Sequence, residues 1–143
     1  MDNIVYKWIN NTEYKDELCR VITQGLGELR TQEAMEAWAL GAISFIVAVN
    51  KEDCVVGCGA IGRLFIYKQS YFLAFNSVLP EYRNNDIGNT ITQKRIERIH
   101  ELGGRFIFSA GKDQWKRYTK FDFKHLCELN SDNETHHLVI SGQ

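Results

Sequence analysis

Two apolar, strand-like segments flank one amphipathic helix between residues 71 and 110, and this order constrains the fold most strongly. The segment Tyr71–Val78 has the composition of a buried strand, and isoleucines then recur at helical spacing and predict a helix over 87–102. Gly103 and Gly104 are typical of a helix end, and Arg105–Ala110 predicts the second strand. A helix that joins two strands of one sheet is a crossover, so we expect the two strands to be parallel.

The rest of the chain predicts further strands and helices. Asn11 and Thr12 are candidate caps for the first helix, and Thr31 for the second. The sequence therefore predicts an α/β fold, with a mixed, mostly antiparallel central sheet flanked by helices. We expect further strands at Ile4–Ile9, Ser44–Val49, Cys54–Ile61, Phe123–Leu129 and His136–Ser141, and further helices over 14–25, 31–42 and 113–120.

Length and composition narrow the class of protein. With 143 residues, 44% of them hydrophobic, we expect a single domain spanning 1–143. The net charge of −1 gives no general attraction for nucleic acid, so we expect no such partner. The longest apolar run, Ala37–Val49, is too short to cross a bilayer, and no leader pattern is visible, so we expect a cytoplasmic protein without a membrane partner. The cysteine and histidine spacings match no common zinc pattern, and we expect no metal.

The turn between the first crossover strand and the helix is the candidate binding site. A helix N-terminus has unpaired backbone N–H groups and partial positive charge, which suit a phosphate or pyrophosphate. Arg83 adds a cation with several donors, and Gly88 allows a ligand close to the backbone. A capped connection without a ligand is the alternative on these residues alone. The candidate residues are Arg83, Asn84, Asn85, Asp86, Ile87, Gly88 and Asn89.

Two segments resemble the motifs of the GNAT superfamily of acetyltransferases. The first is similar to the acyl-CoA motif V-x-P-x-x-R-x-x-G-x-G, which this chain matches at Val78, Pro80, Arg83 and Gly88. The second, Tyr118–Phe123, resembles the family's Y-x-K-x-G-F signature and follows at the expected distance. The predicted order of strands and helices is also that family's order. The resemblance thus covers nearly the whole chain.

The resemblance implies a fold, a donor and roles for particular residues. It implies acetyl-CoA as the acyl donor, with its pyrophosphate on the backbone amides of Arg83 to Asn89. It also implies that the pantetheine arm pairs with the strand end at Asn76, Ser77 and Val78, in a gap where the parallel strands splay apart. Tyr118 would be the general acid that protonates the departing thiolate. The implied reaction is direct attack by a primary amine of a small molecule or protein, in a monomer or a homodimer.

Three residues depart from the family pattern. Asp86 replaces the first glycine of the phosphate turn, Gly111 stands where many members have asparagine, and Asp122 replaces the glycine of the second signature. The strand Tyr71–Val78 also holds no carboxylate that could act as the general base, and a water relayed by Asn76 and Ser77 is one alternative. A catalytically degenerate module that binds acyl-CoA or a protein partner without turnover is therefore the second hypothesis.

Basic side chains allow a third hypothesis. Lysines and an arginine between residues 112 and 124 would suit an acyltransferase that acts on nucleic acid or aminoacyl substrates, although a solvated surface is the commoner role of such charges. The helix cations Lys94, Arg95 and Arg98 are most simply the exposed side of an amphipathic helix.

Overall fold

The computed structural model describes residues 3–65, 68–110, 123–131 and 134–141. The hydrogen-bonded order of its strands is β1-β2-β3-β4-β5-β7-β6. The strands are β1 (Val5–Ile9), β2 (Ile43–Val49), β3 (Val55–Arg63), β4 (Ser70–Val78), β5 (Phe106–Ala110), β6 (Phe123–Ser131) and β7 (Glu134–Ser141). The helices are α1 (Lys15–Leu26), α2 (Glu28–Ala39), the short 3-10 helix η1 (Pro80–Tyr82) and α3 (Ile87–Glu101).

The chain divides into two compact units. Residues 1–62 and 74–95 form the first, and residues 63–73 and 96–143 form the second, so β3, β4 and α3 each run from one unit into the other. The assignment of residues 1–143 to a single domain stays a prediction.

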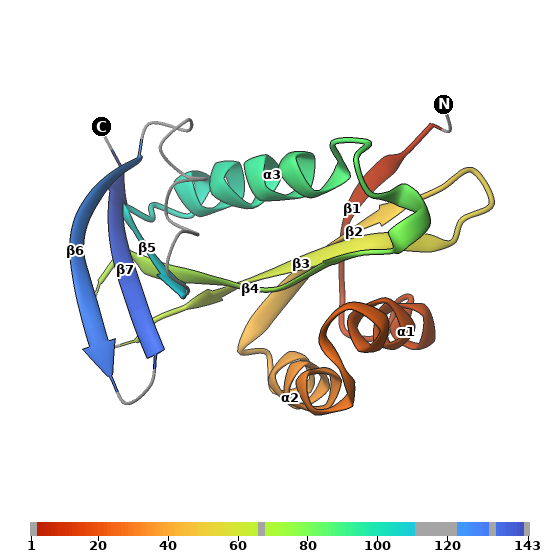
Figure 1. Cartoon of the computed structure of the whole chain (residues 1–143), viewed down its shortest axis with the longest axis horizontal. Helices are drawn as coiled ribbons and strands as arrows, with labels where there is room; N and C mark the ends of the chain where they lie inside the picture. Colours follow the sequence, from red (N-terminus) through yellow and green to blue (C-terminus); the bar gives the residue numbers. More distant parts are fainter. Residues whose placement is uncertain (1–2, 66–67, 111–122, 132–133, 142–143) are drawn as a thin grey trace. The chain divides into compact units, whose positions relative to one another are not determined.

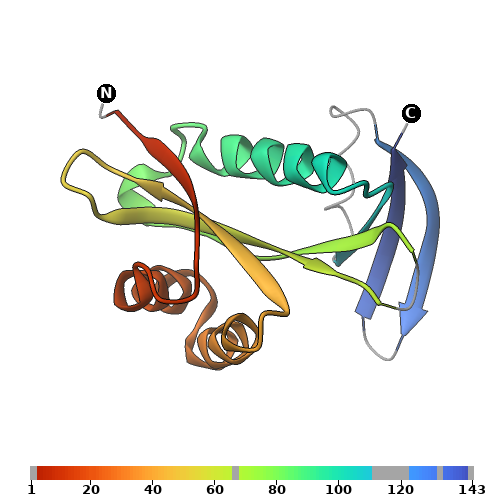
Figure 2. The same cartoon turned by 180° about the vertical axis from the view of Figure 1, so that it is seen from behind.

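The first unit is built on antiparallel strands between helices. β2 pairs with β1 on one side and with β3 on the other. Figures 1 and 2 show α1 and α2 on one face of these strands and the beginning of α3 on the opposite face. Phe45 is fully buried and packs its ring 5.5 Å from Trp38 of α2, so aromatic packing joins α2 to the sheet.

The second unit contains the parallel pair. Ser70, Tyr71 and Phe72 of β4 pair in parallel with Phe106, Ile107 and Phe108 of β5, which confirms the crossover prediction. This registered pairing ends there, although β4 continues to Val78 and β5 to Ala110. β7 pairs antiparallel with both β5 and β6.

The predicted α/β fold with a mixed, mostly antiparallel sheet is confirmed, but the predicted helix caps are wrong. α1 begins at Lys15 after Tyr14 in a left-handed conformation, whereas the Asn10 Oδ1 atom accepts hydrogen bonds from Thr12. Thr31 lies inside α2, where its hydroxyl donates to the carbonyl of Gly27 at 2.9 Å. α2 starts earlier because Gly27, with φ 94°, turns the chain directly from α1 into α2.

The described part of the chain contains no helix that is both long and apolar enough to cross a membrane. The helix predicted over 113–120 lies outside the described residues.

Candidate active site

The candidate turn joins the end of β4 to the start of α3 within the first unit. Leu79 is buried, and its backbone N–H donates to the carbonyl of Val56 in β3 at 2.9 Å, which holds the turn against the sheet. Pro80 begins η1, where its missing N–H costs nothing. The chain then passes through exposed polar residues until Ile87, which is buried, begins α3. The turn is therefore anchored by apolar residues at both ends and polar between them.

Two residues of this turn have left-handed backbones. Asn84 has φ 69° and Asp86 has φ 64°. Asparagine and aspartate tolerate this region better than other residues with side chains, and glycine tolerates it best. Asp86 thus has the backbone conformation that a glycine would favour at this position, and the departure from the family motif does not prevent the turn from forming.

The side chain and carbonyl of Asp86 both take part in the start of α3. Its carbonyl oxygen accepts hydrogen bonds from the backbone N–H and the hydroxyl of Thr90, at 3.0 and 2.9 Å. Its exposed carboxylate accepts a hydrogen bond from the side-chain amide of Asn89 at 2.8 Å. Asp86 therefore caps the helix and places a negative charge beside the N–H groups of its first turn.

Arg83 and Gly88 shape the two sides of the turn. The exposed Arg83 donates its Nε–H to the carbonyl of Val78 at 3.1 Å, which orients the guanidinium. Among the described residues no hydrogen bond uses its terminal nitrogens, which suit an anion. A Cβ atom added at Gly88 would meet only the side chain of Val78, at an ordinary 3.9 Å. Packing within the first unit therefore gives Gly88 no steric reason to be a glycine, whereas a ligand held against the backbone would.

The end of β4, before the turn, is held by a hydrogen bond to α1. The hydroxyl of Ser77 donates to the carbonyl of Val21 in α1 at 2.9 Å, so this side chain faces the helix and only its backbone is available to a donor. Asn76 is half-buried, and within the described ranges its Oδ1 atom is buried without a hydrogen-bond partner. The predicted donor residues from Asn76 to Asn89 thus lie at the end of β4, in the turn and at the start of α3. Their roles stay predictions.

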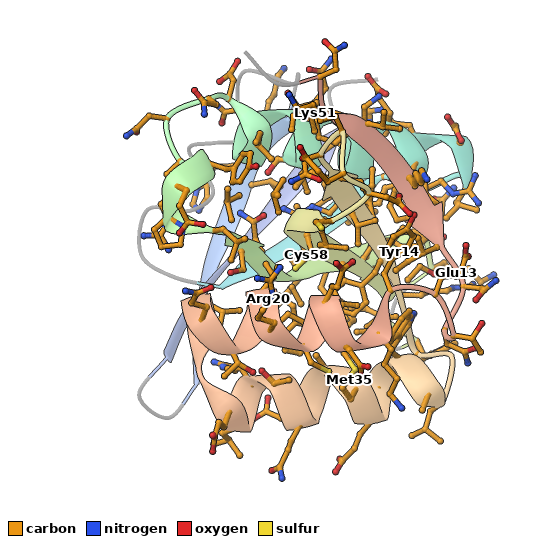
Figure 3. The ribbon with its side chains drawn as sticks, turned by 90° about the vertical axis from the view of Figure 1, so that its right-hand side faces the viewer. Glu13, Tyr14, Arg20, Met35, Lys51 and Cys58 are labelled. Atoms are coloured by element: carbon orange, nitrogen blue, oxygen red, sulfur yellow. The ribbon has the colours of Figure 1, made fainter. Side chains whose placement is uncertain are left out.

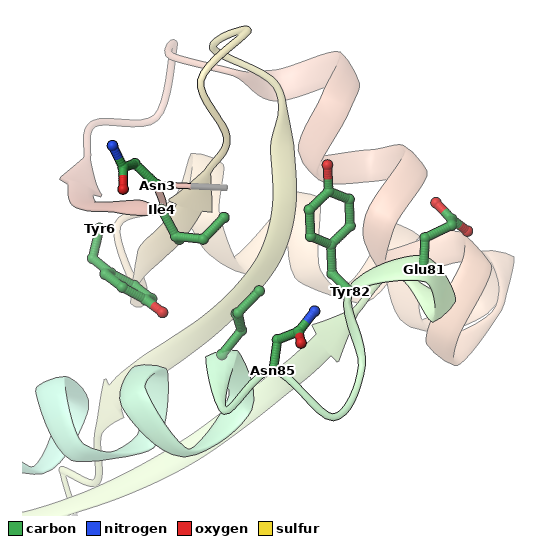
Figure 4. A pocket seen from close by; sticks show the side chains of 7 residues that line it. Asn3, Ile4, Tyr6, Glu81, Tyr82 and Asn85 are labelled. Carbon is green, nitrogen blue, oxygen red and sulfur yellow. The ribbon is translucent and has the colours of Figure 1, made fainter. Parts of the chain in front are cut away.

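The sequence did not predict a pocket that lies beside the turn. It has a volume of about 670 Å³ and lies between β1 and the segment from η1 to α3 (Figure 4). The hydroxyl of Tyr82 accepts a hydrogen bond from the side-chain amide of Asn50 at 3.2 Å. No sequence signal linked the first strand to this turn, because the contact is between residues far apart in the chain. The lining residues are Asn3, Ile4, Tyr6, Glu81, Tyr82, Asn85 and Ile87.

The prediction that Arg95 is exposed on α3 is wrong. Arg95 is only 2% exposed, and its guanidinium donates to the carbonyl of Ala60 and to the hydroxyl of Thr92, both at 3.2 Å. A Cβ atom at Gly59 would lie within 2.9 Å of the guanidinium, so this glycine makes the space that Arg95 fills. Lys94 lies over the ring of Tyr6, 5.6 Å from its centre, and Arg98 pairs with Glu101 at 3.3 Å.

Tyr118, the predicted general acid, lies outside the described residues, as do Gly111 and Asp122. In the part of the chain that the structure describes, no three His, Cys, Asp or Glu side chains are grouped to hold a metal ion.

Comparisons with known proteins give one sequence match and many structural matches. No family model matches the chain. Over 95 residues the chain is 27% identical to an amino-acid acetyltransferase of Aeromonas salmonicida, which covers 65% of this chain. The chain spans only 20% of the length of that relative.

The structural matches extend over nearly the whole chain. A GNAT-family N-acetyltransferase from Escherichia coli in complex with CoA matches with a TM-score of 0.79 at 13% identity, over 96% of this chain and 81% of that one. An aminoglycoside 6'-acetyltransferase type Ii matches with a TM-score of 0.75 at 18% identity, over 94% of both chains. An acetyltransferase of the GNAT family from Staphylococcus aureus Mu50 matches with a TM-score of 0.69 at 20% identity, over 94% of this chain and 98% of that one. The chain therefore has the fold of the GNAT-family acetyltransferases.

Proposed function

We propose that this protein is an N-acetyltransferase that moves an acetyl group from acetyl-CoA to a primary amine. The observation that carries this proposal is the turn before α3. Its left-handed residues Asn84 and Asp86, the oriented Arg83 and the unobstructed Gly88 combine the features of a pyrophosphate site. The fold supports the proposal, because the structural matches are acetyltransferases and one of them is a complex with CoA.

In this proposal the donor is bound mainly by backbone groups. The amides from Arg83 to Asn89, with the N-terminus of α3, hold the pyrophosphate, and the terminal nitrogens of Arg83 add a charge-assisted contact. The backbone of Asn76, Ser77 and Val78 pairs with the pantetheine arm. This division of roles fits the structure, since the side chain of Ser77 is already engaged with Val21 and only its backbone remains.

Asp86 is the residue of the donor site that opposes binding of the pyrophosphate. Its carboxylate lies at the start of α3, where it stabilises the helix but repels a pyrophosphate. The carboxylate is exposed, so water and ions screen the repulsion. We therefore propose that Asp86 lowers the affinity for acetyl-CoA without abolishing binding.

The reaction we propose is direct transfer without a covalent enzyme intermediate. The neutral amine attacks the thioester carbonyl, the C–S bond breaks, and CoA leaves as a thiolate. The hydroxyl of Tyr118 gives its proton to that thiolate, the attacking nitrogen loses a proton to solvent, and solvent then returns a proton to the Tyr118 phenolate. The acceptor is a small molecule or a protein with a primary amine, and the enzyme acts as a monomer or a homodimer.

Two measurements on the same preparation test the proposal. CoA at 100 times its dissociation constant should raise the stability of the protein by about 2.7 kcal/mol, which a thermal-shift assay detects. Incubation with acetyl-CoA and a panel of primary amines should release free thiol together with acetylated amine. CoA binding without turnover on any amine would support the non-catalytic alternative, and the absence of both signals would refute the proposal.

A further inference from the structure

An aromatic residue in the middle of β4 has a left-handed backbone. Phe75 has φ 53°, although it lies between Ala74 and Asn76 in a nine-residue strand. For a bulky residue this conformation is a genuine outlier, and it persists only where the surroundings determine it. Phe75 directly precedes Asn76, the first residue assigned to the donor under the proposed function.

The ring of Phe75 is one of the groups that hold this conformation. Its centre lies 6.3 Å from the ring of Phe45, which in turn packs edge-on against Trp38. This packing fixes the side chain of Phe75 but not the direction of the peptide groups that follow it. Those groups need a partner of their own, because buried backbone N–H and C=O groups are almost always hydrogen-bonded.

Cys58 of β3 supplies that partner. Its thiol donates to the carbonyl oxygen of Phe75 at 3.4 Å. The backbone N–H of Ser77 faces the same sulfur and acts to lower the pKa of the thiol. Cys58 is fully buried in the first unit (Figure 3), and burial raises the pKa of its thiol to about 12, which Arg95 and the backbone N–H of Ser77 only partly oppose. At neutral pH the thiol therefore keeps the proton that it donates to Phe75.

The planarity of the peptide bond gives this contact a consequence for Asn76. In a trans peptide the C=O and N–H groups point in opposite directions, and no cis peptide bond occurs in the described residues. The Phe75 carbonyl faces Cys58, so the Asn76 N–H points away from it. The Ser77 N–H also faces Cys58, so the Asn76 carbonyl points away as well. One sulfur thus directs both backbone groups of Asn76 toward the edge of β4 opposite β3.

A second observation indicates that the hydrogen bonding around Asn76 is incomplete. Among the described residues its side-chain Oδ1 atom is buried and lacks a hydrogen-bond partner, which native proteins seldom tolerate. The registered parallel pairing of β4 has already ended at Phe72. A strand residue that directs a donor and an acceptor to one edge pairs with an extended group carrying an amide, as a neighbouring strand would.

We propose that Cys58 is a positioning residue, whose sulfur holds the peptide groups on both sides of Asn76 so that its N–H and C=O bind an amide of the acyl donor. This inference rests on the proposed function, since it takes the pantetheine amides of CoA as the ligand. Cys58 does not touch the donor and takes no part in the chemical step. The anchor between Ser77 and Val21 is separate, because it uses the serine side chain and leaves the backbone groups unchanged.

Three variants separate positioning from packing. Cys58→Ala removes the hydrogen bond to Phe75 and the contact with the Ser77 N–H, whereas Cys58→Ser keeps a donor and an acceptor at the same position. Val49→Ala, at a residue that is 2% exposed on β2 and pairs with Val55, is the control for a cavity elsewhere in the same core. For each folded variant, the affinity for CoA is measured by calorimetry, and the amide exchange rate of Ser77 is measured by NMR without CoA.

Positioning predicts a pattern that packing alone does not. Cys58→Ala should bind CoA about three- to tenfold more weakly, with faster exchange at Ser77, while Cys58→Ser recovers most of both and Val49→Ala changes neither. CoA affinity in Cys58→Ala within twofold of the wild type would overturn the inference, and so would equal losses in Cys58→Ala and Val49→Ala. A wild-type protein that does not bind CoA would instead refute the proposed function, and unchanged Ser77 exchange in Cys58→Ala would then still overturn the positioning role.

Discussion

Asp86→Asn is the substitution that most sharply tests the pyrophosphate site. Asparagine tolerates the left-handed backbone that Asp86 adopts, at φ 64°, and its side-chain oxygen can still accept the hydrogen bond from Asn89. The exposed side chain keeps nearly the same shape, and only the negative charge is lost. Any change in CoA affinity therefore reports the electrostatic effect of that charge.

The expected gain follows from the exposure of the carboxylate. Two unit charges about 4 Å apart interact with about 1 kcal/mol in water, and nearby salt reduces this further. We therefore expect Asp86→Asn to bind CoA about threefold to tenfold more tightly at low salt, with a smaller gain at high salt. The free energy of unfolding without CoA should fall by about 0.3–1 kcal/mol, because α3 loses a favourable charge at its N-terminus.

Isothermal calorimetry at two salt concentrations, with chemical unfolding in parallel, measures both effects. Asp86→Gly is the matched variant, since it removes the charge and also relieves the left-handed backbone, and it should bind CoA at least as tightly as the wild type. Weaker CoA binding in a folded Asp86→Asn protein would refute the electrostatic penalty assigned to Asp86. The carboxylate would then have a positive role in the site, and the comparison with a glycine turn would be wrong at that residue.

Three further substitutions test Arg83, Tyr118 and the buried thiol of Cys58. Arg83→Ala should weaken CoA binding by about 1.5–3 kcal/mol, because a charge-assisted contact is lost; unchanged affinity in calorimetry would remove Arg83 from the site. Tyr118→Phe should lower turnover at least about a hundredfold while CoA affinity and melting temperature stay nearly constant; wild-type turnover on an acetylated amine would contradict its role as general acid. Cys58→Ser should reduce alkaline destabilisation, because the folded thiol, with a pKa of about 12, stays protonated while the unfolded thiol ionises above its ordinary value of 9.0. The stabilising effect of the Cys58 thiol is thus present below pH 9 and lost as the pH rises toward 12. Between pH 8 and 10.5 the free energy of unfolding of the wild type should therefore fall by about 2 kcal/mol more than that of Cys58→Ser. Equal decreases of the two proteins in chemical unfolding would contradict the raised pKa of the buried thiol.

The order of strands and helices was predictable because local patterns determine it. The isoleucines of α3 recur at helical spacing, and Ile87, Ile91, Ile96 and Ile99 are all buried. The parallel pairing of β4 with β5 followed from the crossover alone, without any contact information. Patterns of this kind act within one segment or between neighbouring segments, and a sequence displays them directly.

One error occurred where a distant residue decided the outcome, and another where the turn before a helix did. Arg95 follows the polar pattern of an exposed helix residue, but Gly59 on β3 leaves the space in which its guanidinium is buried. Thr31 has the chemistry of a helix cap, but the turn at Gly27 lets α2 begin before it. The preference of a single residue is a weak guide in such cases, because tertiary contacts or the geometry of a preceding turn outweigh it.

The candidate site shows the same division. The turn from Arg83 to Asn89 was recognisable from its sequence, since motif residues and a helix start coincide there. The left-handed Phe75 was not, because an aromatic residue in an apolar strand carries no sign of such a backbone. Its partner Cys58 lies 17 residues earlier in the chain, and only the pairing of strands brings its thiol to the Phe75 carbonyl.

The most direct test of the central claim is an NMR titration of the isotope-labelled protein with CoA, following the backbone amides. The proposed donor site predicts the largest chemical-shift changes at the amides from Arg83 to Asn89, accompanied by changes at Asn76. Pantetheine, which lacks the pyrophosphate of CoA, should shift the amide signal of Asn76 but leave the amide signals of the turn nearly unchanged. Saturable CoA binding that leaves the amides from Arg83 to Asn89 unshifted, or no binding at all, would contradict the claim.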